Sequence, residues 1–77
     1  MRLPIQRLDP AAVIPTRGHP GDAGLDLTAL HDVSIPRGTH RAVRTGIAVG
    51  IPFGHVGDVR PRSGLAARHG LTVLNTP

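Results

Sequence analysis

The sequence predicts an all-β fold with one short helix. Three observations support this fold class: short runs in which apolar and polar residues alternate, Pro- and Gly-rich reversals between those runs, and a single helical stretch near the end. Several short strands separated by turns are typical of a barrel or a sandwich. With 77 residues, the chain is one domain at most.

The expected strands follow one another along the chain. Residues 3–8 form a short strand, and Pro4 places it at an edge because proline cannot donate to a sheet ladder. After a loop over residues 9–22, residues 23–29 alternate apolar and polar side chains, as a half-buried strand does. The other strands are expected at residues 33–35, 41–51, 56–59 and 71–74, with turns at 36–39 and 52–54 and a bulge at Gly46 or Gly50.

The helix is expected to begin within the stretch Arg-Pro-Arg-Ser-Gly-Leu-Ala at residues 60–66. We expect Ser63 to be its N-cap and Gly70 its C-terminal stop. A helix start presents free N–H groups, and arginine matches phosphate oxygens with bidentate donors. Arg62, Ser63 and Gly64 therefore indicate a phosphate cradle, and the ordinary alternative is a capped surface helix beside an arginine.

Composition restricts the other function classes. The net charge of +4, carried by arginine and aspartate alone, suits an anionic ligand. Phe53 is the single aromatic side chain, which argues against nucleic-acid binding by base stacking. No long apolar run, signal-peptide core or cysteine is present, so we expect a cytoplasmic protein with no membrane role and no disulfide. The five histidines lack ligand-like spacing.

Two stretches resemble motifs of the trimeric dUTPase family. Residues 22–29, Asp-Ala-Gly-Leu-Asp-Leu-Thr-Ala, resemble its first motif, Ala-Gly-x-Asp-Leu-x-Ala. Residues 61–66, Pro-Arg-Ser-Gly-Leu-Ala, resemble its second motif, in the expected order and spacing. Residues 44–54 resemble the connecting strand and turn, and residues 70–77 resemble the lead-in to the third motif.

The resemblance implies a dUTPase-like jelly-roll or β-clip barrel that assembles as a homotrimer. It implies an enzyme of nucleotide metabolism and dUMP biosynthesis, a dUTP diphosphatase that hydrolyses dUTP to dUMP and pyrophosphate with Mg²⁺. Asp26 would hold the metal, through water molecules. Arg62, Ser63 and Gly64 would bind the phosphates, and Asn75 would face the uracil base, which suits an amide because it both donates and accepts hydrogen bonds.

The resemblance stops at Pro77, before the family's water-activating aspartate and the tyrosine that packs near the deoxyribose. The fourth and fifth motifs are not reached either. We therefore expect residues 1–77 to be the N-terminal portion of one incomplete dUTPase-like domain, from a truncated gene, a split gene or an incomplete sequence. Such a chain would contain no catalytic residue of its own and would be inactive alone.

Two other functions compete with this interpretation. The related dCTP deaminases share the fold and a similar helix start, but they more often carry a second serine where this chain has Gly64. The third reading is a non-catalytic fragment that binds nucleotide or a partner. Single residues also have ordinary readings: Asp26 as a solvated strand residue, Asp22 and Asn75 as turn residues, and Arg60 and Arg68 as surface charges.

Overall fold

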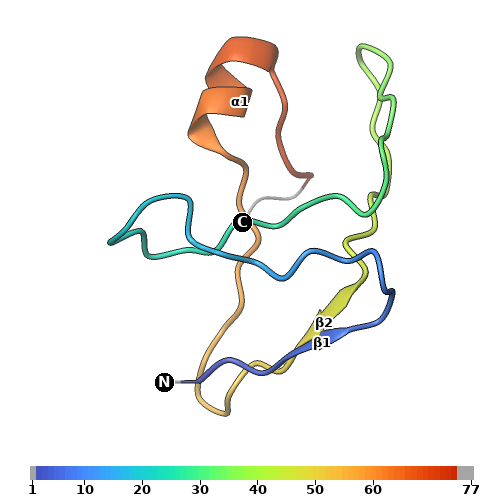
Figure 1. The fold of residues 1–77 in the computed structure, drawn as a ribbon. Helices are drawn as coiled ribbons and strands as arrows, with labels where there is room; N and C mark the ends of the chain where they lie inside the picture. The colour runs from blue at the N-terminus through green and yellow to red at the C-terminus, as the bar shows by residue number, and fades with distance from the viewer. Residues whose placement is uncertain (1, 75–77) are drawn as a thin grey trace.

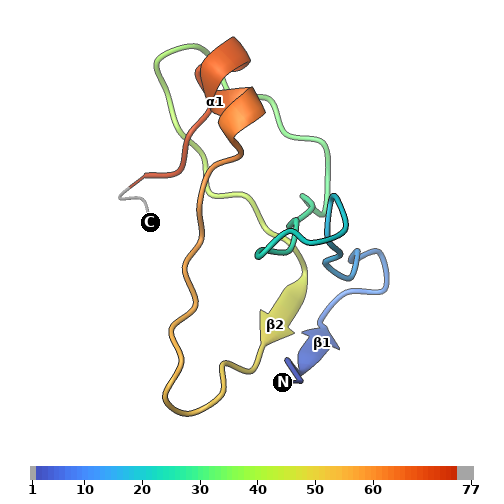
Figure 2. The ribbon, with the colours of Figure 1, turned by 90° about the vertical axis from the view of Figure 1, so that its left-hand side faces the viewer.

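The computed structural model describes residues 2–74 and shows an open arrangement of two short strands and one helix (Figure 1). Strand β1 spans Ile5–Arg7, strand β2 spans Ile47–Val49 and helix α1 spans Ser63–His69. From β2 the chain descends to a turn and then runs back, without regular structure, to α1 at the opposite end (Figure 2). Within residues 2–74, no helix has the length and apolar character needed to span a bilayer.

Strands β1 and β2 pair antiparallel, with Ile5 opposite Val49 and Arg7 opposite Ile47. The Leu8 N–H donates to the Gly46 carbonyl at 2.8 Å, and the Gly50 N–H donates to the Pro4 carbonyl at 2.9 Å, so the pairing continues past both ends of the ladder. Pro4 takes part through its carbonyl alone. The strand expected over residues 3–8 is thus present in shortened form, as β1. The strand expected over residues 41–51 is shortened to β2.

Close packing occurs at Gly46, directly before β2. Gly46 is buried and has a φ of 73°, a conformation that side-chain-bearing residues rarely adopt. A β-carbon there would lie 3.0 Å from Leu30 Cδ1 and 3.1 Å from the β-carbon of Ala12, which is itself only 5% exposed. This small contact joins the N-terminal loop, the segment near residue 30 and the start of β2.

Helix α1 ends as predicted but begins differently. Gly70 adopts the left-handed conformation with a φ of 66°, and its N–H donates to the Ala66 carbonyl, so the expected glycine stop is confirmed. The expectation that Ser63 is the N-cap is wrong. Arg62 keeps the extended backbone that follows Pro61, and its carbonyl accepts the first helical hydrogen bond from Ala66 at 3.0 Å. Ser63 is therefore the first helical residue, and no side chain caps the helix.

Several expected strands are extended segments without a ladder. The turns at residues 36–39 and 52–55 close with backbone hydrogen bonds of 3.1 Å, as predicted. Residues 33–35, 56–59 and 71–74 form no strand, and residues 23–29 contribute only an isolated bridge between Asp26 and Thr16. A strand needs a hydrogen-bonded neighbour, which these segments lack among residues 2–74. The structure thus agrees with a β-rich fold of the dUTPase kind without forming a barrel.

The chain buries little of its apolar surface. Its radius of gyration is 13.6 Å, against about 11.5 Å for a compact chain of this length. Its accessible surface is 6783 Å², about half as much again as the roughly 4,500 Å² of a compact protein of its mass. An open apolar groove of about 640 Å³ contributes to this excess. Its lining includes Ile5, Leu25, Leu27, Ile51, Val56 and Val59.

These dimensions predict that the 77-residue polypeptide alone is not a compact, stable monomer. Strands β1 and β2 have one open edge each, and such edges pair with other chains. We expect sedimentation velocity to show oligomers or an expanded species, and hydrogen exchange to show weak amide protection. A single compact monomer with strongly protected amides in β1 and β2 would contradict this prediction.

Candidate functional site

Asp26 is held where a loop closes on itself. Its N–H donates to the Thr16 carbonyl at 2.8 Å in the isolated antiparallel bridge, so residues 17–25 form a loop closed at its base. The Asp26 side chain is half-buried. The β-carbon that Gly18 lacks would lie 2.9 Å from the Asp26 carboxylate oxygen Oδ2, so the carboxylate occupies the space over this glycine.

The Asp26 loop and the start of α1 line one hollow of about 400 Å³. The loop contributes Gly18, His19, Asp22 and Asp26. The helix contributes Arg62, Ser63, Gly64, Leu65, Arg68 and His69. Two carboxylates and two guanidinium groups therefore border the same space, although some 36 residues separate the two stretches.

Arg68 belongs to this hollow and is not simply a surface charge. It lies four residues after Gly64, on the same face of the helix. The Nη2 atom of Arg68 would lie 3.9 Å from a β-carbon on Gly64, so this guanidinium folds back over the first turn of α1. Arg60, in contrast, forms an exposed ion pair with Asp58 at 3.8 Å, and such pairs contribute little to stability.

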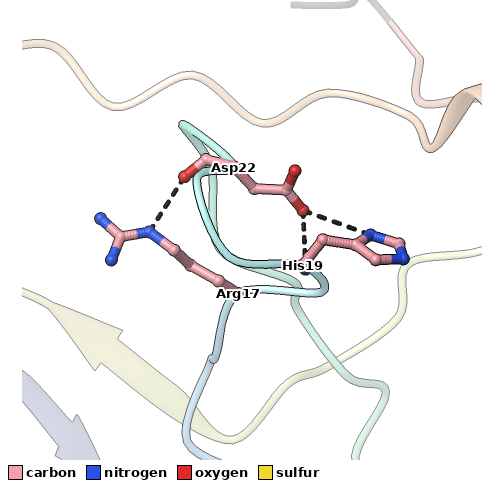
Figure 3. A network of polar contacts seen from close by, with 3 residues as sticks. All are labelled: Arg17, His19 and Asp22. Carbon is pink, nitrogen blue, oxygen red and sulfur yellow. Dashed lines mark hydrogen bonds and ion pairs between the residues drawn. The ribbon is translucent and has the colours of Figure 1, made fainter.

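A network of polar contacts fixes the tip of the loop (Figure 3). The His19 N–H donates to Asp22 Oδ2 at 2.9 Å, and the Asp22 N–H donates to the His19 carbonyl at 3.2 Å. Arg17 Nε donates to the Asp22 carbonyl oxygen at 2.9 Å. These bonds tie Arg17 and His19 to Asp22.

The donor set suits a hydrated divalent cation that also binds phosphate. Mg²⁺ prefers oxygen ligands, keeps several waters, and is usually held by one or two carboxylates plus substrate phosphates. Because Gly18 has no β-carbon, the Asp26 carboxylate can lie against the loop at the edge of the hollow. Within residues 2–74, no three His, Asp or Glu side chains gather as a complete ligand set. A cation here would therefore complete its coordination with water molecules or phosphate oxygens.

The structure thus brings together every predicted site residue that it describes: Asp26, Arg62, Ser63 and Gly64. Their roles stay predictions, and Asn75 lies outside the described residues. Sequence reasoning read Asp22 as a turn residue and Arg68 as a surface charge. The His19–Asp22 turn agrees with the first reading, and both residues also line the hollow. The spacing of four residues from Gly64 could have indicated Arg68, whereas Asp22 lies in an irregular loop without a periodic signal.

Comparison with known families agrees with this arrangement. The family model for dUTPase matches residues 11–75, which include the Asp26 loop and the start of α1. The chain belongs to the dUTPase family. The resemblance of its two motifs to that family is therefore confirmed.

Curated relatives carry the same family name. The chain is 56% identical over 75 residues to deoxyuridine 5'-triphosphate nucleotidohydrolase of Nocardia farcinica, covering 97% of this chain and 46% of that protein. It is 58% identical over 79 residues to the protein of that name from Gloeobacter violaceus, covering 100% of this chain and 54% of that protein. The protein of that name from Thermobifida fusca is 53% identical, with 43% of its length covered. The chain spans about half the length of these relatives.

Proposed function

We propose that this chain supplies the phosphate- and metal-binding part of a dUTP diphosphatase, which hydrolyses dUTP to dUMP and pyrophosphate. The observation that carries the proposal is the shared hollow, in which Asp26 lies across from Arg62, Ser63 and Gly64. Family membership and the names of the relatives support dUTP as the substrate. Those names also favour the diphosphatase over the dCTP deaminase alternative.

Each residue has a defined task in this proposal. Arg62 neutralises phosphate charge through charge-assisted hydrogen bonds, and Ser63 and Gly64 add donors from the first turn of α1. Asp26 holds Mg²⁺ through bound water. When bound, the cation neutralises the charge that develops on the phosphate oxygens. We assign no water-activating residue within residues 2–74, so hydrolysis needs a base from further polypeptide.

The remaining parts of the proposal concern assembly and location. We infer a cytoplasmic enzyme of nucleotide metabolism whose complete domain is a jelly roll that forms a homotrimer. Membership in the dUTPase family supports the role in nucleotide metabolism and the assembly. The cytoplasmic location rests on the sequence expectation alone. The open groove and the unpaired edges of β1 and β2 also support a domain completed by more polypeptide.

Turnover is predicted to need more than the 77 residues. A general base must lie within hydrogen-bond reach of the proton that it removes. We expect no Mg²⁺-dependent pyrophosphate release from dUTP by the chain alone. We expect turnover when residues 1–77 are fused to the part of the Gloeobacter violaceus relative that they do not match. Inactivity of a folded fusion, or deamination of dCTP by it, would contradict the proposal. Turnover by the chain alone would contradict the inference that hydrolysis needs a base from further polypeptide.

Arg62 is predicted to carry phosphate affinity in the fused enzyme. An Arg62→Ala substitution removes hydrogen bonds to a charged ligand worth about 1.5–3 kcal/mol each, or roughly ten- to a hundredfold in affinity. The loss should affect a dUTP analogue with a non-hydrolysable α,β bridge and spare free deoxyuridine in calorimetric titrations. Arg37→Ala is the matched control, because Arg37 lies in the turn at residues 36–39 and does not line the hollow. An equal loss for both ligands would place Arg62 outside the phosphate site.

A further inference from the structure

Gly18 and Asp22 hold no role in the proposed chemistry, yet both lie beside the Asp26 carboxylate. We propose that they are positioning residues for Asp26: Asp22 fixes the turn that contains Gly18, and Gly18 leaves the space in which the carboxylate meets a hydrated divalent cation. This inference rests on the proposed function, because it concerns the metal site that Asp26 serves there.

The first step is the contact between Gly18 and Asp26. A β-carbon on residue 18 would lie 2.9 Å from Asp26 Oδ2, a separation that real β-carbons do not show. Gly18 does not have the positive φ that penalises side chains, so its backbone accepts alanine and the steric clash with the carboxylate is the main consequence. A side chain at residue 18 would therefore require the flexible Asp26 carboxylate to shift from its place beside Gly18.

Asp22 holds this turn through polar contacts with His19 (Figure 3). Its ion pair with the His19 imidazole, at 3.7 Å and with side chains 86% and 48% exposed, is worth little. The hydrogen bond from the His19 backbone N–H to the Asp22 carboxylate is shorter, at 2.9 Å, and is stronger because its acceptor is charged. The backbone next to Gly18 is thus tied down through an acceptor oxygen on residue 22.

Asp22 could hold the turn or bind the cation itself, and the two roles can be distinguished. Asp22 Oδ2 lies 3.5 Å from the same β-carbon position on Gly18, so it also borders this space. If Asp22 acts by holding the turn, an asparagine serves as well, because its carbonyl oxygen accepts the same hydrogen bond. If Asp22 bound the cation itself, loss of its charge would weaken binding. The two roles therefore predict opposite results for Asp22→Asn.

The test is a Mn²⁺ titration followed by paramagnetic broadening of amide NMR signals, on the fused enzyme. In the unmodified fused enzyme we expect broadening centred on residues 18–26, and Asp26→Asn should abolish it. Gly18→Ala and Asp22→Ala should each raise the Mn²⁺ concentration needed by about tenfold or more, as loss of outer-shell support does at metal sites. Asp22→Asn should behave as the unmodified protein does.

Gly50→Ala is the matched control, because a β-carbon on Gly50 meets Pro4 at an ordinary 3.5 Å. The amide shifts of β1 and β2 report whether each variant keeps its fold. The proposal is overturned if no selective broadening occurs in the unmodified fused enzyme, if Gly18→Ala binds Mn²⁺ normally, or if Asp22→Asn loses as much as Asp22→Ala. Pyrophosphate release by the fused enzyme is a separate readout, so the proposed function can stand when this inference fails.

Discussion

The backbone hydrogen bond from Asp26 to the Thr16 carbonyl closes the loop on which the candidate site depends. Closure brings Gly18 beneath the Asp26 carboxylate and turns the loop toward the start of α1. The Asp26 carboxylate lies against Gly18 on one side of the hollow, and Arg62 and Arg68 line it from the α1 side. The bond is made between main-chain atoms, so it does not depend on the identity of either side chain. Side-chain identity matters in the loop between Thr16 and Asp26, where Gly18 and Asp22 shape the turn.

The open architecture explains why the site is incomplete as well as where it lies. The chain exposes about half as much surface again as a compact protein of its mass, and it covers about half the length of its relatives. Strands β1 and β2, with their open edges, lie at the far end of the molecule from α1 (Figure 2). The residues proposed to bind phosphate and metal thus come from local segments, whereas residues 2–74 do not form a full barrel.

Local chemistry was predictable from the sequence, and long-range pairing was not. Pro4 at the sheet edge, the turns at 36–39 and 52–55, and the glycine end of α1 follow from neighbouring residues. Alternating apolar residues predicted extended segments correctly at β1 and β2, but a ladder also needs a partner strand, which periodicity does not reveal. The N-cap moved from Ser63 to Arg62 because the chain stays extended after Pro61. Each of the two motifs predicted one wall of the hollow. The position of Asp22 beside the hollow depends on an irregular loop, which periodicity in the sequence does not reveal.

The central claim is that the Asp26 loop and helix α1 face each other across one hollow, and chemical cross-linking tests it directly. The sequence contains no cysteine, so pairs of introduced cysteines react selectively. His19→Cys combined with His69→Cys places one thiol on each wall of the hollow, whereas His55→Cys with His69→Cys uses a turn that does not line it. With a short bifunctional reagent on dilute protein, the first pair should cross-link within the chain much faster than the second. Equal rates for the two pairs would contradict the account.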